Sequence, residues 1–108
     1  MAALDAAFVD GVSAVLGVNL WGNAADVEAI DSWARDRGIA SYWDSAQALG
    51  CEIGGRRIGG FGRLEVFSLH ATKIVSATEG GCITTNDDDL AKRLRNIRSS
   101  YGAGPPTT

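Results

Sequence analysis

Apolar residues form four separate runs along the chain, divided by glycine-rich or polar segments. Residues 11–20 are a continuous apolar run that contains several valines and ends at a Trp-Gly-Asn turn, which is typical of a strand buried on both faces. Residues 39–43, 64–69 and 81–85 are shorter apolar runs, and each predicts a further strand. The pattern therefore predicts a sheet of several strands.

Two other segments have the periodicity and charge order of helices. In residues 25–37 the apolar residues Val27, Ile30 and Trp33 fall on one helical face, and a glycine follows as a C-terminal stop. A second helix is predicted after Asn86, its expected N-cap, because aspartates open that segment and lysine and arginine residues follow. In both segments acids precede bases, as the helix dipole favours.

Strands that alternate with helices predict an α/β fold, here part of a mainly parallel sheet with flanking helices. The glycine-rich residues 50–62 are expected to form a surface turn, residues 70–78 a loop and residues 102–108 a loose tail. Ligands of such sheets gather at the carboxyl ends of the strands. Asp44 ends one predicted strand and Lys73 lies in the loop after another, so we expect the two in one site.

Composition and charge narrow the classes of partner. The 108 residues suit one small domain, and 45% hydrophobic with 21% charged residues is a globular balance. A net charge of −3 gives no reason to expect a nucleic acid or an anionic membrane as partner. The sequence shows neither a secretory leader nor a membrane-spanning run, and two cysteines are too few for a disulfide framework. We therefore expect a cytoplasmic protein.

Three motifs in a specific order carry the strongest functional signal. Residues 43–47 are Trp-Asp-Ser-Ala-Gln, residues 67–73 are Phe-Ser-Leu-His-Ala-Thr-Lys, and residues 79–81 are Glu-Gly-Gly. With the glycine-rich segment between the first two, this order resembles the DegT/DnrJ/EryC1/StrS aminotransferases, fold-type I pyridoxal-phosphate (PLP) enzymes that act mainly on nucleotide-linked keto-sugars. The resemblance extends over residues 12–102, a minority of a family member. It implies that residues 1–108 are a partial PLP-binding large domain.

The resemblance also implies a role for four side chains. Lys73 matches the amine that bonds the cofactor aldehyde and moves a proton, and Asp44 matches the carboxylate that keeps the pyridine nitrogen protonated. Gln47 matches the residue beside the phenolic oxygen, and Ser68 matches a hydroxyl that contacts the phosphate. The implied reaction moves an amino group from an amino acid, glutamate being the expected donor, to a nucleotide-linked keto-sugar. The resemblance further implies a homo-oligomer.

Simpler interpretations of these residues stay open at this point. A loop lysine is most often a solvated surface charge, an aspartate at a strand end often caps a helix, and a serine often bonds to nearby backbone. His70, inside the second motif, fits a packed histidine as well as a functional one. Asn19 and Trp43 depart from the family, which commonly has His and Glu at these positions.

Two other functions compete with transamination. The family's main phosphate-binding loop and its small C-terminal domain have no counterpart in these residues, which favours a non-catalytic remnant that self-associates. The second alternative is another fold-type I reaction, such as sugar dehydration or elimination from an amino acid. Lys73 argues against the sugar dehydratases of this family, because they have histidine in place of that lysine.

Overall fold

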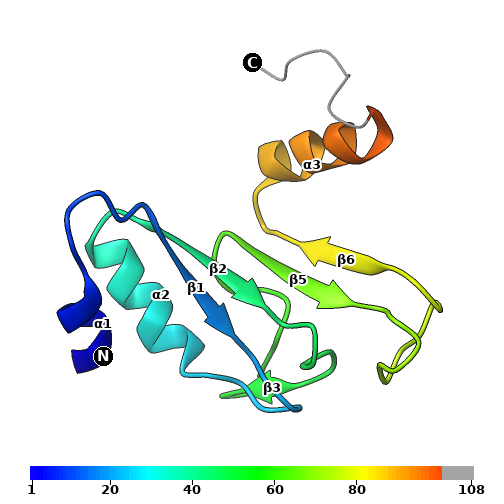
Figure 1. Ribbon diagram of the computed structural model, residues 1–108, viewed down its shortest axis with the longest axis horizontal. Coiled ribbons are helices and arrows are strands. Elements are labelled where there is room, and N and C mark those ends of the chain that lie inside the picture. Colours follow the sequence, from blue (N-terminus) through cyan, green and yellow to red (C-terminus); the bar gives the residue numbers. More distant parts are fainter. Residues whose placement is uncertain (101–108) are drawn as a thin grey trace.

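A computed structural model of the chain describes residues 1–100, and the side chains of residues 1–98. The predicted loose tail at residues 102–108 lies outside this part. The described elements follow one another in the order (Figure 1) α1 (Ala2–Ala7), β1 (Ala14–Val18), α2 (Val27–Asp36), β2 (Ala40–Asp44), β3 (Glu52–Ile53), β4 (Arg56–Arg57), β5 (Leu64–Ser68), β6 (Gly81–Thr84) and α3 (Asp88–Ser100).

Four of these strands form one sheet in the order β1-β2-β5-β6, and β3 and β4 form a separate hairpin. The strands β1, β2 and β5 are parallel, whereas β6 runs antiparallel to β5. In this register Trp43 of β2 lies between Gly17 of β1 and Glu65 of β5. The predicted α/β fold with a mainly parallel sheet is confirmed, and three carboxyl strand ends meet at one edge (Figure 1).

The helix α2 packs against β1 and β2 (Figure 1). Its buried residues Val27, Trp33 and Ala34 belong to the face that the periodicity predicted. Asp26 caps the helix by accepting a hydrogen bond of 3.2 Å from the backbone N–H three residues on. Gly38 follows the helix with a φ of 66°, the left-handed conformation that commonly ends helices.

Trp43 lies at the centre of the core beneath α2. Its side chain is fully buried, and its indole N–H donates to Asp31 of α2 at 2.9 Å. The ring fills space beside two glycines: a Cβ on Gly17 would lie 2.1 Å from a ring atom, and a Cβ on Gly62 would lie 2.7 Å from another. Only glycine allows the neighbouring backbone to approach the ring this closely.

The opposite face of the sheet is open in the described part of the chain. Leu16 and Val18 of β1, Val66 of β5 and Ile83 of β6 are between 41% and 66% exposed. The predicted strand within residues 11–20 is present, but the prediction that it is buried on both faces is wrong. Gly17 is the only buried residue of β1, because α2 covers a single face of this strand.

The helix α1 has no counterpart in the predicted pattern. Asp5 anchors it to α2, since its carboxylate accepts from the indole N–H of Trp33 at 2.7 Å and pairs with Arg37. The guanidinium of Arg37 also lies over the Trp33 ring. Six residues with no buried side chain do not form a stable helix alone, so these tertiary contacts decide the structure of this segment.

The N-cap of α3 is Asp87, and the prediction of Asn86 is wrong. The Asp87 carboxylate accepts from the backbone N–H of Leu90 at 2.9 Å. Asn86 instead donates to the carbonyl of Gly60, which ties the start of α3 to the glycine-rich loop. The predicted order of acids before bases along this helix is confirmed.

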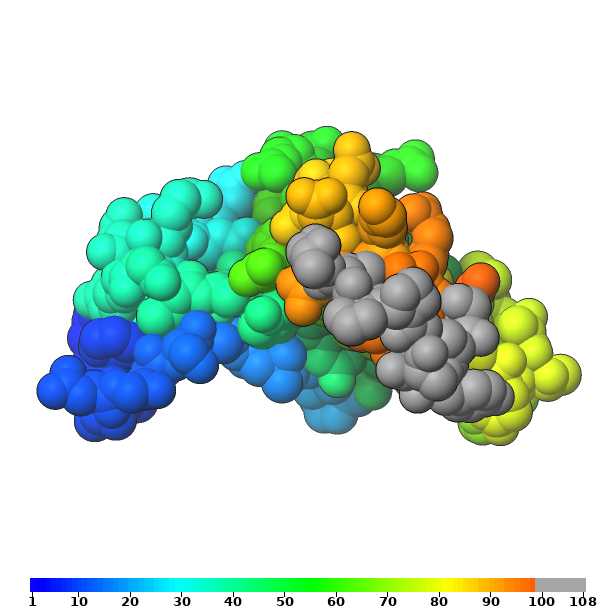
Figure 2. Space-filling model, turned by 90° about the horizontal axis from the view of Figure 1, so that it is seen from above, coloured from blue at the N-terminus to red at the C-terminus, as the bar shows by residue number. Residues whose placement is uncertain are grey.

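Viewed from above, α1 (blue) and the loop after β5 (yellow-green) lie at opposite ends of the molecule (Figure 2). Among the described residues, no helix has the length and apolar character needed to cross a membrane.

Candidate functional site

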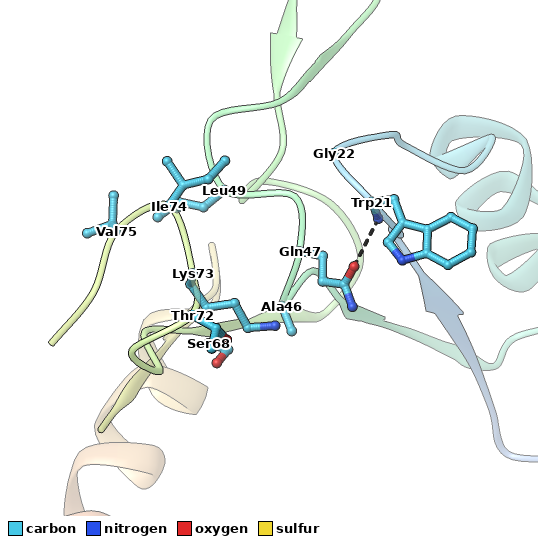
Figure 3. Close-up of a pocket in the computed structure, with 10 residues that line it drawn as sticks. All are labelled: Trp21, Gly22, Ala46, Gln47, Leu49, Ser68, Thr72, Lys73, Ile74 and Val75. Carbon is cyan, nitrogen blue, oxygen red and sulfur yellow. Dashed lines mark hydrogen bonds between the residues drawn. The ribbon is translucent and has the colours of Figure 1, made fainter. Parts of the chain in front are cut away.

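A cavity of about 420 Å³ opens at the carboxyl ends of the parallel strands. Its lining residues come from residues 21–22 after β1, residues 46–49 after β2 and residues 68–75 at the end of β5 and beyond (Figure 3). The volume is within the range of small-molecule sites, and the position is where open α/β sheets bind their ligands.

Lys73 extends into this cavity from the turn after β5, with its amine toward Ala46 and Gln47 (Figure 3). The residue is half-buried. Within residues 1–98 no carboxylate forms an ion pair with its amine. Its backbone N–H donates to the carbonyl of His70 at 2.9 Å, which closes the turn. The chain's other lysine, Lys92, lies on α3, so Lys73 is the lysine amine of this site.

His70 shapes the turn that carries Lys73. Its Nδ1 accepts from the backbone N–H of Thr72 at 3.3 Å and lies 3.0 Å from the Thr72 hydroxyl. Its Nε2 lies 3.6 Å from a carboxylate oxygen of Glu79. The ring is exposed and does not line the cavity, so His70 is neither a packed histidine nor a cavity residue. Its role in the described structure is to hold the conformation of this turn.

Gln47 faces Lys73 and joins two loops. Its side-chain Oε1 accepts from the backbone N–H of Trp21 at 3.2 Å (Figure 3), and its main-chain carbonyl accepts from the N–H of Gly22 at 2.9 Å. Trp21 is 84% exposed, has a φ of 54° and lines the cavity. Because Oε1 is used, the side-chain NH2 of Gln47 is the group able to donate to a ligand.

Asp44 ends β2 beside the cavity. Its carboxylate accepts from the N–H of Ala46 at 3.0 Å, and no helix begins there, so the helix-cap interpretation is wrong. Asp44 lines a second hollow on the open face of the sheet, and Ala46 and Ser68 line both hollows. The structure therefore places Asp44 and Lys73 in adjoining hollows that share a wall, and not in a single cavity.

Ser68 is the last residue of β5 and belongs to that shared wall. Its Oγ accepts from the backbone N–H of His70 at 3.3 Å, so the local backbone bond considered from the sequence is present. That bond uses a lone pair of the oxygen and leaves the hydroxyl hydrogen able to donate. Local bonding and ligand binding are thus compatible at Ser68.

A buried chain of hydrogen bonds connects the same strands away from the cavity. Glu65 of β5 is fully buried, and its Oε1 accepts from the N–H groups of Gly59 at 2.8 Å and Phe61 at 2.7 Å. Its Oε2 accepts from the hydroxyl of Ser45 at 2.7 Å. Ser45 accepts in turn from the side-chain NH2 of Asn19 at 2.9 Å. The bonds join β5 to the ends of β1 and β2.

The face of β5 that carries Glu65 is buried. Glu65 and Phe67 lie on this face and are both buried, whereas Val66 on the other face is 41% exposed. Asn19, a polar residue inside the apolar run of residues 11–20, is the sequence feature that could have indicated this buried hydrogen-bond chain. Trp21 also lines the cavity, and no motif in the sequence marks it as a site residue.

The two hollows together present an amine, an amide, two hydroxyls and a carboxylate, from Lys73, Gln47, Ser68, Thr72 and Asp44. An amine that faces open space can bond an electrophilic carbonyl carbon, while hydroxyl and amide donors hold anionic oxygens of the same ligand. The described residues contain no cluster of three or more His, Cys, Asp or Glu that could hold a metal ion.

Comparisons with known proteins identify relatives of this chain. The family model described as the DegT/DnrJ/EryC1/StrS aminotransferase family matches residues 1–105. The chain is 39% identical over 105 residues to a protein named pleiotropic regulatory protein of Geobacillus stearothermophilus, covering 96% of this chain and 28% of the relative. It is 37% identical over 97 residues to GDP-perosamine synthase of Caulobacter vibrioides, covering 90% of this chain and 26% of the relative.

Among solved structures, DesI in the presence of its TDP-sugar product is similar with a TM-score of 0.86 and 42% identity. The match covers 95% of this chain and 27% of the DesI chain. The chain thus spans about a quarter of the length of these relatives, and the similarity concerns that quarter alone.

Proposed function

Because the chain belongs to the DegT/DnrJ/EryC1/StrS aminotransferase family, we propose that it supplies the lysine-bearing part of a PLP-binding domain. The observation that carries this proposal is the amine of Lys73 in a cavity of about 420 Å³ at the ends of three parallel strands. The reaction is the transfer of an amino group from an amino acid, with glutamate as donor, to a nucleotide-linked keto-sugar.

When bound, PLP supplies an electron sink for bond breaking at the carbon that carries the amino group. Lys73 would hold the cofactor at its aldehyde carbon through its amine, and the same amine would be the group able to move a proton between carbon atoms of the substrate. The turn that His70 and Thr72 hold keeps the Lys73 amine directed into the cavity.

The remaining donors suit the polar groups of the same cofactor. The NH2 of Gln47 can donate to a phenolic oxygen, and the hydroxyl of Ser68 can donate to a phosphate oxygen. The carboxylate of Asp44 can stabilise positive charge on a protonated ring nitrogen. Ala46, whose side chain is a single methyl group, lines both hollows.

A second function is favoured by the open face of the sheet. Leu16 is 66% exposed and Ile83 is 47% exposed on that face, in the two edge strands β1 and β6. An apolar sheet face of this kind supports self-association, either within an active homo-oligomer or in a chain that assembles without binding a cofactor. Another fold-type I reaction is the third alternative, and the lysine at position 73 disfavours sugar dehydration.

The proposal is tested by titrating the protein with PLP and following the visible absorption of the lysine-bound cofactor. Reduction with borohydride then fixes the bond, and peptide mass spectrometry locates the modified residue. The chain offers three amines, those of Lys73, Lys92 and the N-terminus, so the assignment is unambiguous. We expect the label on Lys73 and its loss in Lys73→Ala.

Lys92→Ala is the matched control, because Lys92 is an exposed lysine on α3 outside the cavity. Absence of the absorption band, or a band unchanged in Lys73→Ala and lost in Lys92→Ala, would remove Lys73 from this role. A discrete oligomer in size-exclusion chromatography that lacks PLP affinity would favour the self-associating alternative. Product analysis with glutamate and a nucleotide-linked keto-sugar separates transamination from other PLP reactions.

The wider setting follows from the same proposal. Substrates are small molecules, a nucleotide-linked keto-sugar and an amino acid, and a second copy of the chain is the expected macromolecular partner. The net charge of −3 supports neither a nucleic-acid nor an anionic-membrane partner. We place the protein in the cytoplasm.

A further inference from the structure

Glu65 is a fully buried acidic residue without a place in the proposed chemistry. Three donors converge on its carboxylate: the N–H groups of Gly59 and Phe61 on Oε1 and the hydroxyl of Ser45 on Oε2. An ionised carboxylate accepts hydrogen bonds and donates none, so this set of donors suits the charged form. A buried charge is costly unless its partners are held in place, so Glu65 strongly selects the local arrangement that supplies these donors.

The direction of the Ser45 hydroxyl links Glu65 to β1. The Ser45 oxygen accepts from the NH2 of Asn19 at 2.9 Å, so its own hydrogen points to Glu65. The Oδ1 of Asn19 accepts from the backbone N–H of Ala25 at 2.9 Å. Asn19 therefore closes the loop of residues 19–25 at its base, and its side chain is held by Ser45.

That loop forms one wall of the cavity that contains Lys73. Its residues Trp21 and Gly22 both line the cavity, and both donate their backbone N–H to Gln47. Gln47 itself lies two residues after Ser45. Gln47 and the loop that it contacts are therefore both connected to the hydrogen-bond chain that ends at Glu65: Gln47 through the backbone next to Ser45, and the loop through Asn19.

We propose that Glu65 is a positioning residue of the cavity, acting through Ser45 and Asn19 on the loop of residues 19–25 and on Gln47. This inference rests on the proposed function of the cavity as a cofactor site. Glu65 does not line the cavity, so it acts entirely by holding the wall opposite Lys73 in one position.

The substitution Glu65→Gln separates positioning from packing, because glutamine has the same shape. If the oxygen of the introduced amide keeps the N–H groups of Gly59 and Phe61, its NH2 faces the Ser45 oxygen. The Ser45 hydrogen then loses its acceptor and is left buried without a partner, while the Ser45 oxygen, which has two lone pairs, faces two NH2 groups. We expect weaker closure of the loop, and amide hydrogen exchange at Ala25 and Gly22 faster by about tenfold.

Ser45→Ala is the second variant, since it removes the link while leaving Glu65 and its two backbone donors in place. Asp31→Asn is the matched control. Asp31 also holds a backbone N–H, that of Gly62 at 2.7 Å, together with the Trp43 indole N–H, but it has no bond to the loop. We expect the control to speed exchange at Gly62 and to leave Ala25 and Gly22 as they are in the unaltered protein.

Two exchange results would overturn the inference. One is unchanged exchange at Ala25 and Gly22 in both Glu65→Gln and Ser45→Ala. The other is faster exchange at Ala25 and Gly22 by the same factor as at the amides that bond β1 to β2. That result would show that Glu65 stabilises the whole fold without selecting the loop position.

A PLP titration of the same variants supplies the functional arm. We expect the dissociation constant of PLP to rise about tenfold in Glu65→Gln and Ser45→Ala, in step with the exchange rates. Faster exchange with unchanged PLP affinity would refute the positioning role. If the unaltered protein binds no PLP, the proposed function fails by itself, and the exchange experiment still decides whether Glu65 controls the loop.

Discussion

Gly17→Ala is the substitution whose effect the structure defines most sharply. An added Cβ would lie 2.1, 2.5 and 2.6 Å from three ring atoms of Trp43. The ring is held on the side away from Gly17: its N–H is bonded to Asp31 at 2.9 Å, and a Cβ on Gly62 would lie 2.7 Å from its Cδ1. The strand or the ring must therefore shift, and the buried hydrogen bond is strained or lost.

The expected cost follows from these contacts. Overpacking of a core typically costs about 1–3 kcal/mol. Loss of a hydrogen bond that leaves buried polar groups unpaired adds about 1–3 kcal/mol. We expect Gly17→Ala to lower the free energy of unfolding by about 3 kcal/mol, roughly a hundredfold or more in the folding equilibrium. Urea unfolding followed by circular dichroism measures this value.

Gly60→Ala is the matched control, because an added Cβ there has nothing within 4 Å and its φ is outside the left-handed region. We expect the control to change stability by less than about 0.5 kcal/mol. Trp43→Phe, which removes ring atoms, is expected to offset part of the Gly17→Ala cost, with a coupling energy of about 1 kcal/mol or more. Equal stability of the Gly17→Ala and Gly60→Ala proteins would refute the close approach of β1 to the Trp43 ring.

Two further substitutions test local structure in the same unfolding assay. Asp87→Ala removes the carboxylate that accepts from the N–H of Leu90 and is expected to lower the free energy of unfolding by about 1 kcal/mol. Asn86→Ala is expected to lower it by less, and the reverse order would identify Asn86 as the cap. Gly55→Ala places a side chain at a φ of 77° in the hairpin turn, with nothing within 4 Å of the added Cβ. Backbone strain alone is therefore expected to lower the free energy of unfolding by about 1–2 kcal/mol. Unchanged stability would show that this turn adopts another conformation.

Much of the secondary structure is readable from neighbouring residues. The predicted strands at 39–43, 64–69 and 81–85 each agree with an observed strand to within a residue or so, and residues 25–37 contain α2. Hydrophobic periodicity, acids at the start of a helix and a glycine at its end are properties of residues close together in sequence. The elements that they specify can therefore be predicted from the sequence itself. The loop position of Lys73 follows in the same way, since it lies between two such strands.

The candidate site could be predicted only in part. The motif order places Lys73, Gln47 and Ser68 at the cavity, and the structure finds all three among its lining residues. It also separates Asp44 into an adjoining hollow, which the strand-end argument did not anticipate. That argument places residues at an edge of the sheet but does not say on which side of the neighbouring backbone each side chain lies.

The tertiary structure alone decided which polar groups are buried together. Glu65, an acidic residue within a strand, bonds to Ser45, 20 positions away, and Ser45 bonds to Asn19, 26 positions away. Local pattern determined the places of β2, β5, β6 and α2 along the chain. Which sheet face is covered, and which charge lies inside, depends on contacts between distant segments, because burial is a property of the packed layers and not of the residues next in sequence.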